Sequence, residues 1–288
     1  MFIGWNKKKT SNFMSKKQQK RTFGLIGFPL GHSFSKRYFT DKFEREQIED
    51  CQYDLFPMEF VAHLPVLLDQ NPSLCGLNVT IPHKQAVIPY LDGMDAAAKA
   101  VGAVNCIKID ADGRLTGYNT DAIGFKQSLK NKADGKWASV PTQAIVLGNG
   151  GAARAVFYVL QQLGIPYQVI SRKPDPNNAI EQDWKALPSI ISGIKKHSPD
   201  SPVLVVNTTP VGMAPNTDMC PELPFELLDK RFLIFDLIYN PTETVLLRQA
   251  ASKECATLNG LEMLYLQADA AWEVWNMEGT DLLCLKNH

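Results

Sequence analysis

The stretch Thr142–Gly164, TQAIVLGNGGAARAVFYVLQQLG, predicts one half of the fold. An apolar run typical of a buried strand leads into a glycine-rich turn, and an amphipathic helix follows directly. The turn fits the pattern G-x-G-x-x-A with Gly148, Gly150 and Ala153. Such a turn brings backbone N–H groups at a helix N-terminus close to a pyrophosphate. We therefore predict a Rossmann dinucleotide-binding domain, with a glycine-rich turn of another α/β protein as the alternative; its predicted cofactor-binding residues are Gly148, Asn149, Gly150, Gly151 and Ala152.

The end of the next predicted strand indicates which dinucleotide is bound. About 20 residues beyond the glycines, NAD-binding domains usually carry an acidic residue that contacts the ribose 2′-hydroxyl. This chain has ISRKPD there, with Ser171, Arg172 and Lys173. Two cations at this position match a 2′-phosphate, so we predict NADP as the cofactor. A solvated pair of loop cations is the alternative.

The part of the chain before this domain also alternates strands and helices. FGLIG, YDLFPM and GLNVTIP are strand-like, and helices are expected from about Phe34 to Glu46 and through HLPVLLDQ. This rhythm predicts a second, mostly parallel α/β domain. A helix beginning at Asp121 marks the boundary between the domains. Near the end, Met263, Leu266, Ala270 and Val274 share one face of a last helix.

Composition and charge limit the classes of function. The 288 residues include 30 basic and 30 acidic side chains, so the net charge is zero and no nucleic-acid partner is expected. The six cysteines are widely spaced, without a CxxC pair or a metal-ligand spacing to histidine, so no metal site is predicted and reduced thiols are expected. The charged opening of the chain lacks a signal sequence or membrane span, and we expect a disordered tail and a cytoplasmic, membrane-free protein.

Polar residues cluster at four predicted strand ends. The clusters are GHSFSK with Ser33 and Ser35, NVTIPHK with Asn78, Thr80 and Lys84, GAVNC with Asn105, and GYNTD with Asn119, Thr120 and Asp121. Because the carboxyl ends of parallel strands meet at one edge of a sheet, these side chains are expected to face one crevice. Hydroxyls, amides, one cation and one carboxylate suit a small polyhydroxylated acid.

In this order and spacing, the motifs resemble those of the shikimate dehydrogenase family over nearly the whole chain after Thr22. The resemblance implies NADPH-dependent reduction of 3-dehydroshikimate to shikimate, a step in aromatic amino-acid synthesis. It also implies a substrate domain, an NADP-binding Rossmann domain and C-terminal helices that return to the first domain. The corresponding ranges are 1–21 for the tail, 22–121, 122–260 and 261–288. Whether the chain is a monomer or a homodimer stays open.

The resemblance also assigns roles to residues. Lys84 and Asp121 match the catalytic pair of the family, and a structural ion pair between domains is the alternative. Ser33 and Ser35 match the hydroxyls that hold the substrate carboxylate. Thr80, Asn105, Tyr239 in DLIYNP and Gln267 in LYLQA match ligands of the ring hydroxyls. In the cofactor domain, the matching positions are Thr208 in NTTPVGM, beside the nicotinamide ribose, and Leu237 and Gly260, which line the nicotinamide.

Three positions depart from the family pattern. Lys36 replaces a proline after HSxS, Asn149 replaces the commoner alanine of GAGGAA, and Glu262 replaces a glycine after Gly260. The sequence leaves open whether Glu262 faces solvent or the cofactor. Two other functions also stay open: a quinate/shikimate dehydrogenase that accepts NAD as well, and a non-catalytic NADP-binding sensor. A relative acting on a folate fits less well, because HSxS and the Lys84/Asp121 pair suit a small acid.

Overall fold

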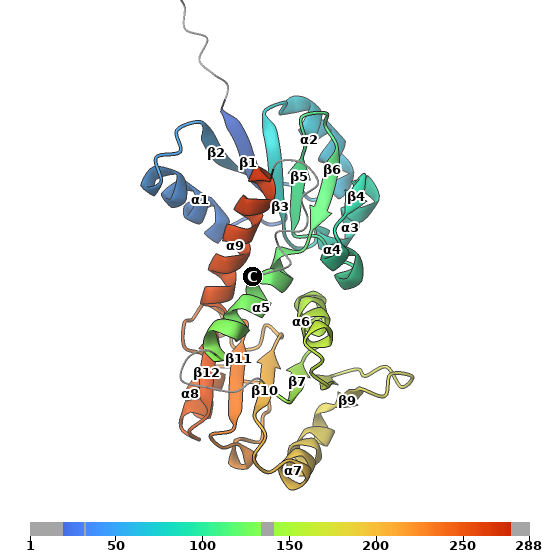
Figure 1. Cartoon of the computed structure of the whole chain (residues 1–288), viewed down its shortest axis with the longest axis vertical. Helices are drawn as coiled ribbons and strands as arrows, with labels where there is room; N and C mark the ends of the chain where they lie inside the picture. The colour runs from blue at the N-terminus through green and yellow to red at the C-terminus, as the bar shows by residue number, and fades with distance from the viewer. Residues whose placement is uncertain (1–19, 32, 134–140, 278–288) are drawn as a thin grey trace, which may run out of the picture.

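The computed structural model of the protein describes residues 20–31, 33–133 and 141–277. It contains two six-stranded sheets, one at each end of the molecule, with α5 (Thr120–Ala133) and α9 (Leu261–Asn276) between them (Figure 1). Most of the predicted tail, residues 1–19, lies outside the described residues, as does Cys284. The first strand begins at Arg21.

The N-terminal unit is a mixed α/β layer structure. Its elements are β1 (Arg21–Gly27), α1 (Phe34–Arg45), β2 (Cys51–Pro57), η1 (Val61–His63), α2 (Leu64–Gln70), β3 (Leu74–Val79), α3 (His83–Ala86), η2 (Ile88–Tyr90), β4 (Gly93–Met94), α4 (Ala96–Val101), β5 (Cys106–Ile109) and β6 (Leu115–Tyr118). The sheet order is β2-β1-β3-β5-β6-β4. The expected helices through residues 34–46 and 63–70 are confirmed, within one or two residues.

The sequence predicted a mostly parallel sheet. Strands β2, β1 and β3 are parallel, but β5 runs antiparallel to both of its neighbours. The local reason is a tight turn between β5 and β6. Gly113 has a φ of +83°, and its N–H donates to the carbonyl of Asp110 at 2.9 Å. A short turn of this kind joins antiparallel strands, whereas a parallel pair needs a crossover.

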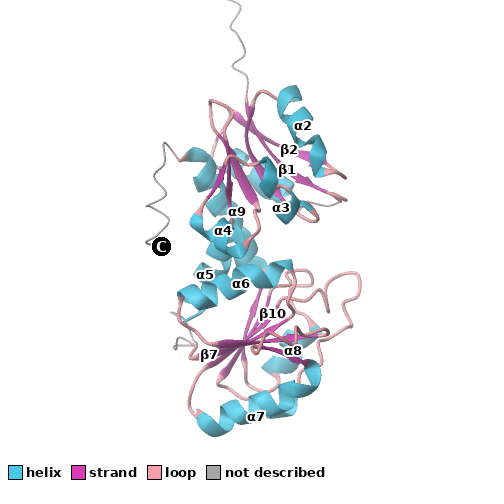
Figure 2. Ribbon diagram, turned by 90° about the vertical axis from the view of Figure 1, so that its right-hand side faces the viewer, coloured by secondary structure: helices cyan, strands magenta, loops and turns pink. Residues whose placement is uncertain are grey.

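The C-terminal unit is a doubly wound Rossmann fold. After α5, its elements are β7 (Gln143–Leu147), α6 (Gly151–Gln162), β8 (Tyr167–Ser171), β9 (Glu181–Asp183), η3 (Trp184–Ala186), α7 (Leu187–His197), β10 (Val203–Asn207), η4 (Phe225–Leu227), β11 (Phe232–Asp236), α8 (Val245–Ala251) and β12 (Ala256–Asn259). All strand pairs of this sheet are parallel, in the order β12-β11-β10-β7-β8-β9. Buried apolar clusters cover both faces, with α5 and α6 on one side and α7 and α8 on the other (Figure 2).

The last helix connects the two units. At the start of α9, Met263 packs on the core beneath α5 and α6. Further along, Val274 and Trp275 are buried in the core of the N-terminal unit, where the Trp275 ring stacks on Phe23 at 4.8 Å and its Nε1 donates to the carbonyl of Ile107 at 3.0 Å. Replacing a buried tryptophan by alanine costs on the order of 3–5 kcal/mol, so this contact holds α9 on the N-terminal unit. The return of the C-terminal helix to the first unit is therefore confirmed.

Candidate active site

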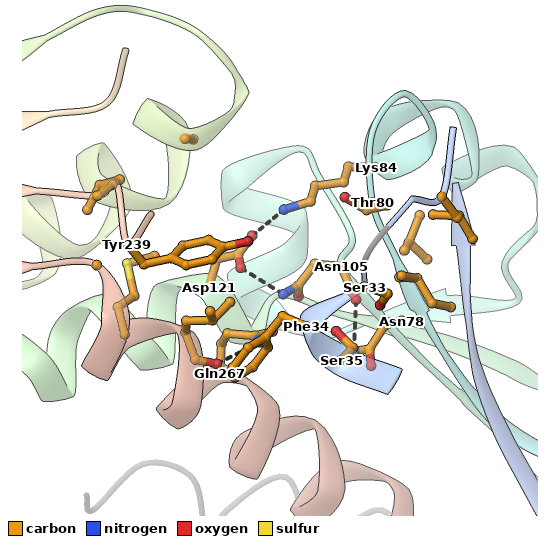
Figure 3. Close-up of a pocket in the computed structure, with 18 of the residues that line it drawn as sticks. Ser33, Phe34, Ser35, Asn78, Thr80, Lys84, Asn105, Asp121, Tyr239 and Gln267 are labelled. Atoms are coloured by element: carbon orange, nitrogen blue, oxygen red, sulfur yellow. Dashed lines mark hydrogen bonds and ion pairs between the residues drawn. The ribbon is translucent and has the colours of Figure 1, made fainter. Parts of the chain in front are cut away.

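Two charged side chains meet between the N-terminal sheet and α5. Lys84 lies on α3, directly after β3, and its Nζ is 2.7 Å from Oδ2 of Asp121 in the first turn of α5. The other carboxylate oxygen accepts a hydrogen bond from Nδ2 of Asn105 at 2.9 Å. The Lys84 and Asp121 side chains are 33% and 22% exposed, so the pair is desolvated in part but still open to a ligand. Figure 3 shows Lys84 and Asn105 pointing toward Asp121.

Backbone contacts explain the position of Lys84. The N–H of Thr80 donates to the carbonyl of Ile26 on β1, and the N–H of His83 donates to the carbonyl of Thr80, both at 2.9 Å. The buried ring of His83 lies with Nε2 2.5 Å from the carbonyl oxygen of Met58. The carbonyl of Lys84 itself accepts from the N–H of Val104 at 2.7 Å. Hydrogen bonds thus hold the turn after β3 on both sides, and they fix the backbone position of Lys84.

A second buried network fixes the start of α5. Asn105 accepts from the backbone N–H of Thr120 at 2.7 Å and donates to its hydroxyl at 2.9 Å. Asn119 caps the helix by accepting from the N–H of Ala122 at 3.0 Å, and it donates to the carbonyl of Ala103. These amides satisfy backbone groups that a helix terminus leaves without partners. They hold Asp121 at a defined place and orientation.

The ion pair borders a cavity of about 370 Å³ between the two units. All eight residues predicted to be catalytic or to bind substrate line it: Ser33, Ser35, Thr80, Lys84, Asn105, Asp121, Tyr239 and Gln267. Ser33 also caps α1, because its hydroxyl accepts from the N–H of Lys36 at 3.3 Å. The structure therefore brings these residues together around one space (Figure 3).

Asn78 lines this cavity, as expected for the polar cluster that also holds Thr80 and Lys84, although the sequence assigned it no role in catalysis or substrate binding. Sequence reasoning missed other lining residues. Phe34 lies between the two serines and contacts the ring of Tyr239, with ring centroids 6.3 Å apart. Met263 and Leu264 come from α9 and look like ordinary core residues in the sequence.

A second cavity, of about 550 Å³, lies along the glycine-rich turn. Gly148 has a φ of +101°, and a Cβ there would stand 2.8 Å from the hydroxyl oxygen of Thr208, so only glycine fits this turn. A Cβ at Gly150 or Gly151 would meet nothing within 4 Å, which leaves open space before the N-terminus of α6. The predicted cofactor residues that line this cavity are Gly148, Asn149, Gly150, Ser171, Arg172 and Thr208.

The other predicted cofactor residues lie elsewhere. Ala152, Leu237 and Gly260 border the first cavity, so the turn before α6 separates the two spaces. Gly151 and Lys173 are exposed and belong to the lining of neither cavity. Trp184 and the segment 219–222 complete the wall of the second cavity, and no local pattern in the sequence marks them.

Glu262, which replaces a family glycine, contacts α5 and faces neither cavity. Nδ2 of Asn131 on α5 donates to the Glu262 carboxylate at 2.7 Å, so this carboxylate is engaged on the α5 side and belongs to the lining of neither cavity. Gly260 is much more constrained, because a Cβ there would stand 2.0 Å from the carbonyl oxygen of Leu237. The departure from the family at residue 262 therefore leaves both cavities as they are.

The described residues contain neither a metal-ligand cluster nor a membrane-spanning helix. Within ranges 20–31, 33–133 and 141–277, no group of three or more His, Cys, Asp or Glu side chains has the arrangement of a metal site. No helix among them is long and apolar enough to cross a membrane. The five cysteines described are free thiols, and burial raises the pKa of Cys51 to about 11 and that of Cys255 to about 12.

Comparison with known proteins agrees with this geometry. The family model of the shikimate dehydrogenase substrate-binding domain matches residues 25–107. An NADP⁺-dependent shikimate dehydrogenase of Desulforamulus reducens is 37% identical over 269 residues, which cover 88% of each chain.

Several solved structures are similar to this chain over most of its length and theirs. Shikimate 5-dehydrogenase of Thermus thermophilus in complex with NADP(H) and shikimate has a TM-score of 0.73 and 30% identity, covering 88% of this chain and 93% of that one. Quinate dehydrogenase of Corynebacterium glutamicum in complex with NAD has a TM-score of 0.72 and 27% identity, covering 90% and 94%. With the fold, the paired cavities and the 37% identity to the Desulforamulus enzyme taken together, this chain belongs to the shikimate dehydrogenase family.

Proposed function

We propose that this protein catalyses the NADP-dependent, reversible reduction of 3-dehydroshikimate to shikimate in the synthesis of aromatic amino acids. The observation that carries the proposal is the 2.7 Å contact between Lys84 and Asp121 at the wall of a cavity lined with hydroxyl and amide groups. A small polyhydroxylated acid has the matching polar groups. The family relationship supports the same substrate.

Lys84 and Asp121 would carry the proton chemistry. In the reducing direction the C3 carbonyl oxygen gains negative charge, and the Lys84 ammonium group stabilises this charge and donates the proton. In the oxidising direction the neutral amine accepts the proton of the C3 hydroxyl. Asp121 orients Lys84 through its Oδ2 and accepts from Asn105 through its Oδ1. The carboxylate that orients Lys84 therefore has a fixed position before substrate arrives.

The remaining polar residues of the first cavity would bind and orient the substrate. Ser33 and Ser35 stand at the N-terminus of α1, where the helix dipole favours a carboxylate. The amides and hydroxyls on the other walls would bind the ring hydroxyls; they belong to Thr80, Asn105, Tyr239 and Gln267. Tyr239 and Gln267 come from the C-terminal part of the chain, so the site is complete only when both units contribute.

The second cavity fits NADP. The first turn of α6 begins with exposed Gly151 and Ala152, and the N-cap residue Gly150 brings no side chain, so the helix N-terminus is open to a pyrophosphate. Arg172 and Lys173 make no ion pair within the described part of the chain, which leaves both cations available to a 2′-phosphate. When bound, NADPH supplies the hydride. Leu237 and Gly260 would line its nicotinamide end, next to the substrate cavity.

A second candidate is oxidation of quinate, with NAD accepted as well. The similarity to a quinate dehydrogenase structure holding NAD favours it. Arg172 and Lys173 favour NADP over NAD, because an acidic residue for the ribose 2′-hydroxyl is replaced here by cations. We also expect the protein to work in the cytoplasm, as a monomer or a homodimer.

The test is nicotinamide absorbance over time in four mixtures: shikimate or quinate, each with NADP⁺ or NAD⁺. We expect rapid reduction with shikimate and NADP⁺ and much slower reduction in the other three. Comparable rates with quinate or NAD⁺ would support the dual-specificity function. Binding of NADPH without turnover of shikimate or 3-dehydroshikimate would contradict the proposal and support a sensor.

A further inference from the structure

Asn78 presents a buried amide at the wall of the first cavity. It lies near the end of β3, is 5% exposed, and lines the space that also holds Ser35 and Lys84 (Figure 3). Its Oδ1 is 2.8 Å from the hydroxyl oxygen of Tyr53, and its Nδ2 is 3.4 Å from the carbonyl oxygen of Asn105. An asparagine amide has one acceptor end and one donor end, so its neighbours decide which end faces the cavity.

Tyr53 sets this orientation from the adjoining core. It lies on β2, is 2% exposed, and its ring stacks on the buried ring of Phe39 with centroids 4.7 Å apart and an interplanar angle of 13°. Burial raises the pKa of the Tyr53 phenol well above its usual value, so the hydroxyl stays protonated. A protonated hydroxyl here donates to Oδ1 of Asn78, while the carbonyl of Asn105 needs a donor. Only one orientation of the amide satisfies both neighbours.

In this orientation Nδ2 carries two hydrogens, of which the Asn105 carbonyl takes one. The other is free to serve an oxygen atom of a ligand in the cavity. A flipped amide would present an acceptor instead, and a shikimate carboxylate oxygen would then be repelled. The direction of one amide in the first cavity therefore depends on a hydroxyl outside that cavity.

We propose that Tyr53 is a positioning residue for substrate binding, whose hydroxyl holds the Asn78 amide with an N–H directed at an oxygen of the bound acid. The inference rests on the proposed function for the identity of that acid. Tyr53 does not line the cavity, so its hydroxyl acts on the substrate through Asn78, to which it donates, with the Ser35 side chain as its other hydrogen-bond partner.

The test is Tyr53→Phe, which removes one oxygen and keeps the ring in its stack on Phe39. We expect the KM and the Kd for shikimate to rise about tenfold, the loss expected for one hydrogen bond. The KM for NADP⁺ should stay within about twofold, and kcat should change less than the KM for shikimate. Tyr118→Phe, which removes a hydroxyl from the same buried cluster, is the matched control and should leave both constants unchanged.

A double-mutant cycle separates positioning from a general effect on the fold. If Tyr53 acts through Asn78, Tyr53→Phe should have no further effect on shikimate affinity in an Asn78→Ala background. A lower melting temperature of Tyr53→Phe with an unchanged Kd for shikimate would overturn the inference, as would full additivity of the two substitutions. Failure of the wild type to oxidise shikimate would instead overturn the proposed function, and the inference with it.

Discussion

Nζ of Lys84 lies 2.7 Å from Oδ2 of Asp121, and this contact joins the turn after β3 to the first turn of α5. Asn105 holds the second oxygen of the carboxylate and also the backbone N–H of Thr120. The pair is therefore part of a hydrogen-bonded network and is not a mobile surface contact. Because the cation faces a cavity and keeps a third of its side-chain surface exposed, it is placed to exchange a proton with a ligand.

Arg172 is expected to determine the preference for NADP. Arg172→Ala removes a cation at the end of β8 and should raise the KM for NADP⁺ about 10- to 100-fold, since a hydrogen bond to a charged group is worth about 1.5–3 kcal/mol. The KM for shikimate should stay within about twofold. Initial rates at varied NADP⁺ and NAD⁺ check both values, with Arg248→Ala, at an exposed position on α8, as the control. An unchanged NADP⁺/NAD⁺ ratio would show that Arg172 is a solvated loop residue.

Gly260 and Glu262 are expected to behave in opposite ways. Gly260→Ala places a methyl group 2.0 Å from the carbonyl oxygen of Leu237, so the backbone at the cavity must shift. We expect kcat to fall at least tenfold and the melting temperature to decrease. Glu262→Ala removes only the contact with Asn131 and should leave kcat and the KM for NADP⁺ within about twofold. Steady-state kinetics and thermal melts of both variants test these expectations. A large kinetic defect in Glu262→Ala would contradict the placement of this side chain.

Asp229 should make folding stability depend on pH. It accepts from Nε and a terminal nitrogen of Arg231 at 2.8 and 2.7 Å, and these bonds, with Lys195 at 3.1 Å, hold its pKa well below the usual value. A carboxyl group with a lowered folded-state pKa contributes stability above its unfolded-state pKa of about 4, and that contribution is lost as the pH falls further.

Asp229→Asn should therefore lower the melting temperature by roughly 1–3 °C at pH 7, and the difference from the wild type should shrink below about pH 4. Thermal melts at pH 7 and pH 3 measure this. Asp69→Asn, at an exposed position on α2, is the control and should match the wild type at both values. A difference for Asp229→Asn that stays constant with pH would mean that packing, and not charge, carries its contribution.

Local patterns were enough to predict most of the fold. The glycine-rich turn predicts the strand before it and the helix after it, and β7 and α6 lie there. The helix predicted to begin at Asp121 begins one residue earlier, at Thr120, because Asn119 caps it. The antiparallel β5 was not predicted, because strand direction depends on where the chain reverses and not on the composition of the strand.

The candidate site, like the fold, was predicted only where local motifs mark its residues. Lys84, Asp121 and the serines stand in motifs with a recognisable order, so the sequence placed them in one site. Tyr53 has the sequence signature of an ordinary core residue, and only the distance to Asn78 shows its contact with the site. Trp184 reaches the second cavity because β9 adds to the edge of β8, a pairing between distant segments that no local pattern encodes.

The most direct test of the central claim is the rate of NADPH formation from shikimate and NADP⁺ by the wild type and by Lys84→Ala, measured side by side. General acid–base catalysis contributes about 10²- to 10⁴-fold, so kcat of the variant should fall by that factor while its Kd for NADP⁺ stays within about twofold. Lys99→Ala, on the exposed side of α4, should keep the wild-type rate. Near-normal turnover by folded Lys84→Ala would contradict the account and leave Lys84 and Asp121 as a structural ion pair.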